Sequence, residues 1–375
     1  MPHLKFVPRK IFIDKECRDM PLTKRILKNL GQVPTEMVSD SQSFLEERRI
    51  SRDAIRQGKK DLFITSQKGE FIKPCPCTPR YLGCNYFIIN LDLNCPLDCS
   101  YCILQHYLYD PILIVHANLD DLWKQLDAFI DKNKGRSFRI GTGELGDSLV
   151  LDHITENSKD LISYFRGKGP VLFELKTKTV NIQNILETEP ASNIVVSWSL
   201  NSPRVARSEE ANAPAVEERI DAARRVADKG FFVGFHFDPL IRYPACEEEY
   251  ESVIERLLKM VSPKKIAWIS LGSLRFPPSL KQIIQERFPW TQIIYEEMIK
   301  GLDGKLRYFR PSRLNLYKRI IRCIKENGGE KVPLYLCMES ETIWRDALGW
   351  VPRGKESLES YLSSPPGNFE SMNAS

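Results

Sequence analysis

The stretch YFIINLDLNCPLDCSYCILQ, residues 86–105, holds the two features that decide the fold and the site. Five of its first six residues are apolar or aromatic and β-prone, which is typical of a buried strand. Cys95, Cys99 and Cys102 follow directly, in the spacing Cys-x3-Cys-x2-Cys. The stretch therefore predicts a strand whose carboxyl end leads into a loop that carries three thiols.

Five further β-rich runs follow the first one, and helical patterns separate them. The runs lie at residues 137–142, 171–176, 193–200, 231–237 and 265–274. Apolar residues recur three and four positions apart over residues 118–132, 214–229, 250–261 and 279–288. Strands and helices in alternation are typical of a parallel sheet with right-handed crossovers. We therefore predict an α/β fold, either a doubly wound open sheet or a partial (βα)6 TIM-type barrel, with its site at the carboxyl ends of the strands.

The composition of the 375-residue chain is that of an ordinary globular protein, with 42% hydrophobic residues and a net charge of +5. We expect an N-terminal extension over residues 1–85, the barrel over 86–300, a C-terminal extension facing the substrate over 301–352, and a loose tail over 353–375. The sequence has neither a long apolar run nor an apolar signal segment. We therefore expect a cytoplasmic protein without a membrane partner.

Six of the ten cysteines lie within residues 75–102. This crowding favours a metal site over a secreted disulfide scaffold, whose cysteines are spread more evenly. Thiolates are the usual ligands of iron–sulfur clusters, and three of them on one loop leave one iron of a [4Fe–4S] cluster open. A zinc site that also uses Cys75, Cys77 and Cys84 is an alternative, as are three buried core cysteines. The spacing and the strand context favour the cluster, whereas the roles of Cys75, Cys77 and Cys84 stay open between redox, metal-binding and structural functions.

The cysteine spacing resembles that of the radical S-adenosylmethionine (SAM) superfamily. The resemblance implies a partial (βα)6 barrel, a [4Fe–4S] cluster on Cys95, Cys99 and Cys102, and SAM bound at the open iron. Reductive cleavage of SAM would then yield a 5′-deoxyadenosyl radical, with an electron donor such as a flavodoxin or ferredoxin. Tyr101 matches the aromatic residue that the superfamily usually has before its last cysteine. The match implies that the Tyr101 backbone lies near the SAM adenine, and Tyr101 is also a candidate for a catalytic role.

Residues at the end of the second strand are candidates to hold SAM. The stretch GTGELGDS, residues 141–148, is rich in glycine, which lets the backbone approach a ligand closely. Gly143 and Glu144 resemble part of the Gly-Gly-Glu motif of the superfamily, in which the methionine amino group is bound. Glu144 is then the expected acceptor of that ammonium, and a helix cap or a structural role is the alternative.

Polar residues also end the third, fourth and fifth strands. Lys176 could pair with the SAM carboxylate, and Ser199 and Asn201 could bond the ribose. Solvated loop positions explain these three residues equally well. His236 and Asp238 resemble half of a metal site, but a histidine whose hydrogen bonds are satisfied near the adenine or the substrate is the favoured interpretation.

A more specific resemblance covers about two thirds of the chain, roughly residues 60–320. The stretch CNYFIINLDLNCPLDCSYCILQHYL, residues 84–108, is similar to the cluster region of the spore photoproduct lyase family of DNA-repair enzymes. The similarity includes ERIDAARRVADKGFFVGFHFDPLI (217–241) and SLRFPPSLKQIIQERFP (273–289). It implies a lyase-like radical SAM enzyme that acts on DNA.

Two positions depart from that family. In the family, a cysteine at the end of the second strand donates a hydrogen atom to the substrate radical, and this position is Glu144 here. The tyrosine that follows the last cluster cysteine is replaced by Ile103. Cys337, in the strand-like run LYLCME, could replace the lost thiol, although an ordinary small core residue is the favoured interpretation.

A basic and aromatic stretch, residues 305–319, suits phosphate contacts and base stacking. With one arginine that ends the sixth strand, the candidate DNA contacts are Arg275, Arg307, Tyr308, Arg310 and Arg313. A solvated helix face is the alternative for this stretch. For the whole protein, the alternatives are a radical SAM enzyme with a substrate other than DNA, and a non-catalytic iron–sulfur or zinc protein that binds nucleic acid.

Overall fold

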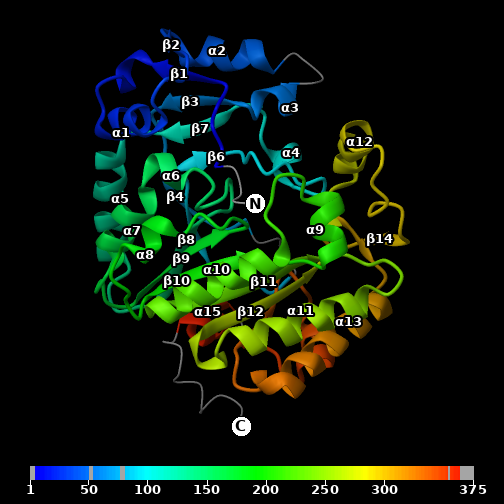
Figure 1. Cartoon of the computed structure of the whole chain (residues 1–375). Helices are drawn as coiled ribbons and strands as arrows, with labels where there is room; N and C mark the ends of the chain where they lie inside the picture. Colours follow the sequence, from blue (N-terminus) through cyan, green and yellow to red (C-terminus); the bar gives the residue numbers. More distant parts are fainter. Residues whose placement is uncertain (1–4, 50–53, 77–80, 354, 364–375) are drawn as a thin grey trace.

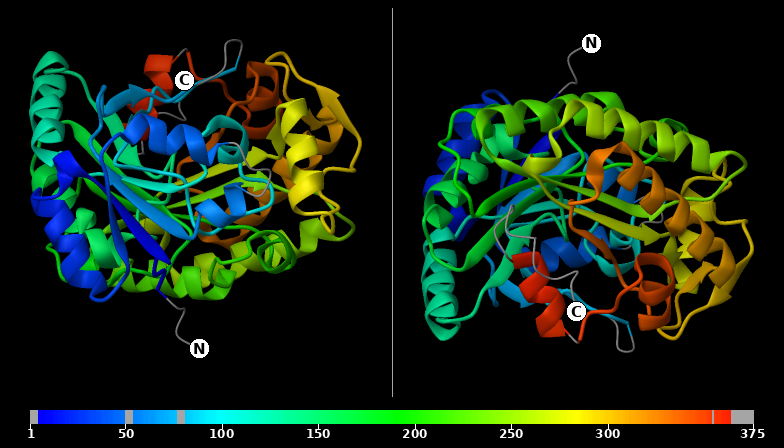
Figure 2. Two further views of the ribbon diagram at one scale, coloured as in Figure 1. Left: turned by 90° about the horizontal axis from the view of Figure 1, so that it is seen from above. Right: turned by 90° about the horizontal axis from the view of Figure 1, so that it is seen from below.

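The computed structural model describes residues 5–49, 54–76, 81–353 and 355–363, and its centre is a curled sheet (Figures 1 and 2). Within these residues, the strands of the sheet run in the spatial order β16 (Leu334–Leu336), β12 (Ile266–Ser273), β11 (Phe232–Leu240), β10 (Ile194–Ser199), β9 (Val171–Thr177), β8 (Phe138–Thr142), β5 (Phe87–Ile89) and β4 (Ile72–Pro74). All neighbours are parallel except β4 and β5. The predicted partial (βα)6 barrel is thereby confirmed, with β4 and β16 added at its edges.

Helices connect the barrel strands, and several of them pack against the outer face of the sheet (Figure 1). They are α4 (Leu104–Tyr107), α5 (Leu119–Lys132), α6 (Asp152–Thr155), α7 (Asn157–Phe165), α8 (Gln183–Leu186), α9 (Pro203–Glu209), α10 (Val216–Lys229), α11 (Cys246–Met260) and α12 (Pro278–Arg287). In α10, Val216, Ile220, Ala223 and Ala227 are buried at helical spacing toward β10 and β11. Gly230 ends that helix, with a positive φ of 121° that favours glycine.

A second sheet lies at the top of Figure 1 and crosses the expected boundary at residue 85. Its order is β2 (Thr35–Val38), β1 (Lys10–Asp14), β3 (Asp61–Thr65), β7 (Leu113–His116) and β6 (Asp92–Leu93). The accompanying helices are α1 (Pro21–Leu30), α2 (Ser41–Arg48) and α3 (Ala54–Gly58). Because β6 and β7 flank the cysteine loop in sequence, the N-terminal segment and that loop are built into one sheet.

The C-terminal segment adds a small antiparallel sheet and several helices. The sheet has the order β13 (Arg275–Phe276), β15 (Leu306–Tyr308) and β14 (Met298–Lys300), and the helices are α13 (Arg310–Ile324), α14 (Glu341–Leu348) and α15 (Lys355–Ser363). Short 3-10 and π turns complete the chain at η1 (Lys15–Cys17), η2 (Pro263–Lys265) and η3 (Lys325–Gly329).

The prediction of a loose tail from residue 353 is wrong for α15. This helix packs against β8, with Leu358 and Leu362 each only 1% exposed. Glu359 also bonds Arg136, with an Oε1–Nη2 distance of 2.8 Å. Two apolar side chains four residues apart give the helix a buried face, which outweighs the Ser- and Pro-rich composition around it. Residues 364–375 lie outside the described part of the chain.

The described helices include none with the length and apolar character needed to span a bilayer.

Candidate active site

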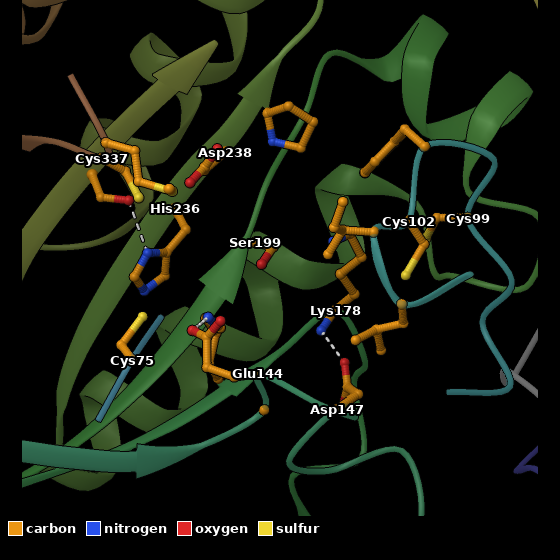
Figure 3. A pocket seen from close by; sticks show the side chains of 18 of the residues that line it. Cys75, Cys99, Cys102, Glu144, Asp147, Lys178, Ser199, His236, Asp238 and Cys337 are labelled. Atoms are coloured by element: carbon orange, nitrogen blue, oxygen red, sulfur yellow. Dashed lines mark hydrogen bonds and ion pairs between the residues drawn. The ribbon is translucent and has the colours of Figure 1, made fainter. Parts of the chain in front are cut away.

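A cavity of about 350 Å³ lies at the carboxyl ends of the barrel strands (Figure 3). Its wall includes the three cysteines of the loop after β6 and residues near the ends of β8, β9, β10, β11 and β16. Parallel βα strands gather their loops at this edge, which is why the sequence predicts the site there. Figure 3 shows Cys99 and Cys102 on one side of the cavity and His236, Asp238 and Cys337 on the other.

The cysteine loop wraps around one end of the cavity. Cys95, Cys99 and Cys102 all line it. Asn94 and Asp98 have positive φ values of 73° and 51°, which turn the backbone sharply on either side of Cys95. Asn94 fixes the start of the loop, because its Nδ2 donates to the Pro111 carbonyl at 3.0 Å and its Oδ1 accepts the Cys95 N–H at 2.9 Å.

Asp98 ties the middle of the same loop to two other parts of the molecule. Its carboxylate accepts from Lys59 Nζ at 2.7 Å and from Arg287 Nη2 at 2.9 Å. Burial works to raise the pKa of Asp98, but the charges and hydrogen bonds of the two cations hold it below its ordinary value. The loop is therefore fixed in place by the second sheet on one side and by α12 on the other.

The donor set of this loop suits a [4Fe–4S] cluster. Three thiols from one loop line one cavity, and thiolates are the usual cluster ligands. Among the described side chains, no group of three His, Cys, Asp or Glu residues converges as the ligands of a single metal ion would. Burial raises the pKa of Cys99 to about 12, and coordination to iron would offset this because a metal-bound thiol is deprotonated.

The Tyr101 hydroxyl belongs to a buried carboxylate network. The Tyr101 hydroxyl donates to Glu210, and Glu210 in turn pairs with Arg219, both side chains being fully buried. Ser100 binds the adjacent Glu209 through its backbone N–H, which donates to the Glu209 carbonyl at 2.8 Å. Tyr101 still lines the cavity with part of its surface. The network fixes the segment that carries Cys99 and Cys102 against the loop after α9.

The predicted SAM residues Gly143, Glu144 and Lys176 line the cavity together. Gly143 has a φ of 90°, and a Cβ there would lie 2.5 Å from the Lys176 carbonyl, so the sequence needs glycine at this point. The Lys176 ammonium donates to the Glu144 carboxylate. Each of these two charges is therefore already balanced by the other.

A second lysine on the same wall was not predicted. Lys178 lines the cavity beside Cys99, and its Nζ lies 5.7 Å from the centre of the Tyr101 ring. Asp147 positions it, because the Asp147 carboxylate accepts from the Lys178 N–H and the Thr177 hydroxyl, both at 2.7 Å (Figure 3). Lys176 is the more prominent residue in the sequence because it follows the apolar run. Lys178 follows two residues later, and two residues along an extended chain return to the same side.

The structure separates the two residues predicted to bond a ribose. Ser199 lines the cavity between the cysteine side and the Cys337 side (Figure 3). Asn201 is 1% exposed and does not line it. Its Nδ2 donates to the Pro239 carbonyl at 3.0 Å, and its Oδ1 accepts from the Tyr250 hydroxyl. The prediction for Asn201 is wrong, because its amide connects β10 to β11 inside the protein.

Both ring nitrogens of His236 have hydrogen-bond partners. Its Nε2 lies 2.8 Å from Glu174 Oε1, and its Nδ1 lies 2.8 Å from the Ser270 hydroxyl. Burial works to raise the pKa of Glu174, but the charge and hydrogen bond of His236 bring it to about 2. The ring is therefore held between β9 and β12 and presents an edge to the cavity.

Asp238, Arg275 and Cys337 form a connected group on the same side. Arg275 pairs with Asp238 through Nη1 and Oδ1 at 2.8 Å, and its Nη2 donates to the Cys337 sulfur at 3.3 Å. Burial works to raise the pKa of Asp238, but the Arg275 charge lowers it to about 2. All three line the cavity. Cys337 is therefore a wall residue, so the favoured interpretation of it as an ordinary core cysteine is wrong.

The basic residues predicted to contact DNA point mostly into the protein. Arg307 is 1% exposed and pairs with Asp303, and Arg313 is 6% exposed and pairs with Glu339. Tyr308 is completely buried. The prediction is wrong for Arg307, Tyr308 and Arg313 as surface contacts, because Asp303 and Glu339 draw the two arginines inward. Arg275 pairs with Asp238 but lines the cavity, so its contact with the substrate stays a prediction. Arg310 is on the surface, where it pairs with Asp346 at 2.6 Å.

Cys75 and Cys84 also line the cavity, and Figure 3 shows Cys75 on the side of His236 and Cys337. Cys77 lies outside the described residues. The possible redox, metal-binding and structural roles of these cysteines stay predictions.

A partial (βα)6 barrel with a three-cysteine loop at the cavity end of its first strand defines the radical SAM class of enzymes. Within that class, the family model "Spore photoproduct lyase" matches residues 6–310. The chain belongs to the spore photoproduct lyase family.

Individual relatives are distant but cover most of the chain. The spore photoproduct lyase of Geobacillus sp. (strain Y412MC61) is 23% identical over 324 residues, which is 84% of this chain and 91% of that protein. The lyase of Bacillus subtilis (strain 168) is 23% identical over 330 residues, 86% and 92% of the two chains. A solved structure of spore photoproduct lyase complexed with dinucleoside spore photoproduct has a TM-score of 0.77 and 22% identity, covering 89% of this chain and 100% of that one. A mutant of the lyase with bound AdoMet and the same dinucleoside has a TM-score of 0.75, with 22% identity and 89% and 99% coverage.

Proposed function

We propose that this protein is a radical SAM enzyme that acts on a pyrimidine photoproduct in DNA. One observation carries the proposal: a single cavity joins the three loop thiols to a wall of hydrogen-bonding side chains that ends at Cys337. The cavity volume of about 350 Å³ lies in the range of small-molecule sites. Family membership supports the same class of reaction, and relatives have been solved with AdoMet and with a dinucleoside spore photoproduct.

Cys95, Cys99 and Cys102 would hold the cluster as thiolates. When bound there, a [4Fe–4S] cluster would supply the electron for reductive cleavage of SAM, which is the source of a 5′-deoxyadenosyl radical. The chain positions the ligands through Asn94 and Asp98, which fix the two turns of the loop.

The remaining cavity side chains would orient SAM. Lys178 is the favoured partner of the SAM carboxylate, because it lies beside the cysteines and no carboxylate pairs with its ammonium among the described side chains. Glu144 would accept the methionine ammonium while it also holds Lys176. Ser199, between the two sides of the cavity, can bond the ribose, and the Tyr101 backbone would border the adenine.

The substrate would occupy the side of the cavity farther from the cysteines. His236, Asp238 and Arg275 present fixed donors and acceptors there, and pyrimidine bases offer carbonyl and imide groups that match both. Cavity walls of this kind exclude bulk water, which protects radical intermediates from side reactions.

A second candidate, a radical SAM enzyme with a substrate other than DNA, is favoured by one observation. Glu144 and Lys176 form an ion pair in the cavity wall. Glu144 stands at the position where the spore photoproduct lyase family has its hydrogen-donor cysteine. Such a wall suits a more polar substrate than a pair of thymine bases.

One assay distinguishes the candidates. The protein is loaded with iron and sulfide without oxygen and given SAM, a one-electron reductant, and either dinucleoside spore photoproduct or an undamaged thymidine dinucleotide. The proposal predicts 5′-deoxyadenosine and conversion of the photoproduct to thymidine residues. SAM cleavage without conversion would leave the second candidate, and a cluster-loaded protein that does not cleave SAM would leave a non-catalytic protein.

A further inference from the structure

Cys337 lies at the end of the edge strand β16, facing the cavity. Its backbone N–H donates to the Leu271 carbonyl of β12 at 2.8 Å, which continues the parallel pairing of Leu336 with Leu271. Its side chain lines the same cavity as the cluster cysteines but on the other side (Figure 3). The thiol is therefore held by a strand and separated from the three cysteines by the space proposed for SAM and substrate.

Several buried side chains converge on residues 337–339. Arg275 Nη2 donates to the Cys337 sulfur at 3.3 Å, and Arg307 Nη1 donates to the Met338 carbonyl at 3.0 Å. Arg313 Nε and the Tyr317 hydroxyl both donate to Glu339 Oε1 at 2.9 Å. The basic residues that the sequence assigns to DNA thus fix the short segment that carries the thiol. Support of this kind is what holds a functional side chain in a fixed geometry.

Arg139 independently indicates that a ligand group sits in this part of the cavity. It lines the cavity, is only 1% exposed, and has no hydrogen-bond partner for Nε or Nη1 among the described residues. Its guanidinium lies 5.5 Å from the centre of the Tyr335 ring, two residues before Cys337. A buried guanidinium left without an acceptor is costly, and a carbonyl or anionic oxygen of a bound molecule would supply one.

We propose that Cys337 is the hydrogen-atom donor of this site, delivering its thiol hydrogen to a carbon radical of the substrate that is held by Arg139. The inference rests on the proposed function. In the step, the Cys337 S–H bond breaks homolytically and a C–H bond forms on the substrate, which leaves a thiyl radical on the sulfur. One electron from the same class of one-electron reductant that serves the cluster, and one proton from solvent, return the thiyl radical to the thiol.

The surroundings of Cys337 suit hydrogen-atom donation. Burial, followed by the neighbouring Asp238 carboxylate, raises the pKa of the Cys337 thiol well above its ordinary value. The sulfur therefore keeps its hydrogen near neutral pH, whereas a thiolate has none to give. Arg275 holds the sulfur from the side of β13, which makes it a positioning residue. Glu144, which stands where the resembling family has its thiol, cannot take this role because a carboxyl O–H is a poor hydrogen-atom donor.

The test uses deuterium to follow the thiol hydrogen of Cys337, because this hydrogen exchanges with the solvent in D₂O. Cluster-loaded wild type, Cys337→Ser and Cys337→Ala are given SAM, reductant and dinucleoside spore photoproduct in D₂O. Mass spectrometry then measures the yield and the deuterium content of the repaired dinucleotide. The serine keeps the contacts with Arg275 and Asp238 but has a much stronger O–H bond. We expect one solvent deuterium per product in the wild type, and at least a tenfold lower yield in both variants while substrate-dependent 5′-deoxyadenosine continues to form.

Cys323→Ala serves as the matched control, because Cys323 is a buried cysteine of α13 that does not line the cavity. It should behave as the wild type. A second readout needs no turnover: iodoacetamide labelling of Cys337, followed by peptide mass spectrometry, should be slowed at least tenfold by the bound dinucleoside.

The outcomes separate the two proposals. Wild-type yield and deuterium content in Cys337→Ser would overturn the inference and leave the proposed function intact, as would labelling of Cys337 that the dinucleoside does not slow. A wild type that produces no repaired dinucleotide would overturn the proposed function and this inference with it.

Discussion

At the scale of single residues, the cavity wall gives different partners to two lysines that lie two positions apart in the sequence. Lys176 and Lys178 both line the cavity. The sequence favours Lys176, because it follows the apolar run of β9. The fold gives Lys176 a partner in Glu144 and places Lys178 beside Cys99 and Tyr101. The three cysteines could be identified from their spacing alone, whereas the charge balance of a lysine depends on a partner about thirty residues away, which no local pattern shows.

The first prediction concerns this pair of lysines. Lys178→Met should weaken SAM binding to the cluster-loaded protein by about 10-fold to 100-fold, the loss expected for one charge-assisted hydrogen bond. Lys176→Met should weaken it by less than about 3-fold, because Lys176 is already paired with Glu144. Isothermal titration calorimetry measures both affinities. A larger loss of affinity in Lys176→Met than in Lys178→Met would show that Lys176, not Lys178, binds the SAM carboxylate.

At the scale of secondary structure, the periodicity of the sequence predicts the barrel strands and their helices. It does not predict whether charged side chains face the interior or the solvent. The stretch 305–319 contains strand β15 and most of α13. Its arginines face inward because Asp303 and Glu339 lie within reach in the fold. Strand β7 is not evident in the sequence because a strand of four residues next to a loop gives too short a signal. Long-range pairing decided the direction of Arg313 and the position of β7, whereas Arg307 pairs with a residue only four positions before it.

The second prediction tests the support of the segment that carries Cys337. Glu339→Gln removes the charge that balances Arg313, and both side chains are at least 92% buried. Breaking a buried ion pair on one side costs about 3 kcal/mol or more of unfolding free energy. Asp346→Asn is the control, because its pair with Arg310 is exposed and should contribute less than about 1 kcal/mol. Urea unfolding gives both values, and equal losses would show that the segment does not depend on Glu339.

The third prediction concerns pH and strand β6. Burial, followed by the charge of Asp147, raises the pKa of Asp92 to about 7. An ordinary Asp has a pKa near 4 when unfolded, so the folded protein binds more protons between roughly pH 4 and 7. Stability from this group is therefore greatest at low pH and falls as the pH rises through about 7. Asp92→Asn should lose that dependence, so its stability relative to wild type should be about 2 to 3 kcal/mol higher at pH 8 than at pH 5. Thermal unfolding at the two pH values measures this, and an unchanged difference would argue against the raised pKa.

At the scale of the whole molecule, the second sheet and the barrel both contribute to the support of the cysteine loop. β6 and β7 lie on either side of the loop in sequence and pair with each other, and β7 also pairs with β3 of the N-terminal segment. Lys59, which follows α3, reaches Asp98 inside the loop. The sequence predicted the barrel from its repeating pattern, but it could not show that a non-repeating N-terminal segment supplies the support for the loop, since that pairing links residues more than thirty positions apart.

The fourth prediction tests this coupling. A Cβ at Gly58 would lie 2.6 Å from the Pro111 carbonyl, in the segment between the cysteine loop and β7, so the backbone must shift to admit it. Gly58→Ala should lower the unfolding free energy by about 1 to 3 kcal/mol and reduce the iron retained after anaerobic loading. Gly69→Ala is the matched control, because a Cβ there meets no atom within 4 Å. Equal iron content and stability in the two variants would show that the sheets are not coupled through this contact.

The most direct measurement of the central claim is Mössbauer spectroscopy of the protein loaded with ⁵⁷Fe without oxygen, recorded with and without SAM. If Cys95, Cys99 and Cys102 are the only protein ligands of a [4Fe–4S] cluster, four irons per chain should be found, and SAM should change the signal of one of them. Serine at all three positions should abolish the cluster. A cluster that survives those substitutions, or one in which SAM changes no iron, would contradict the account.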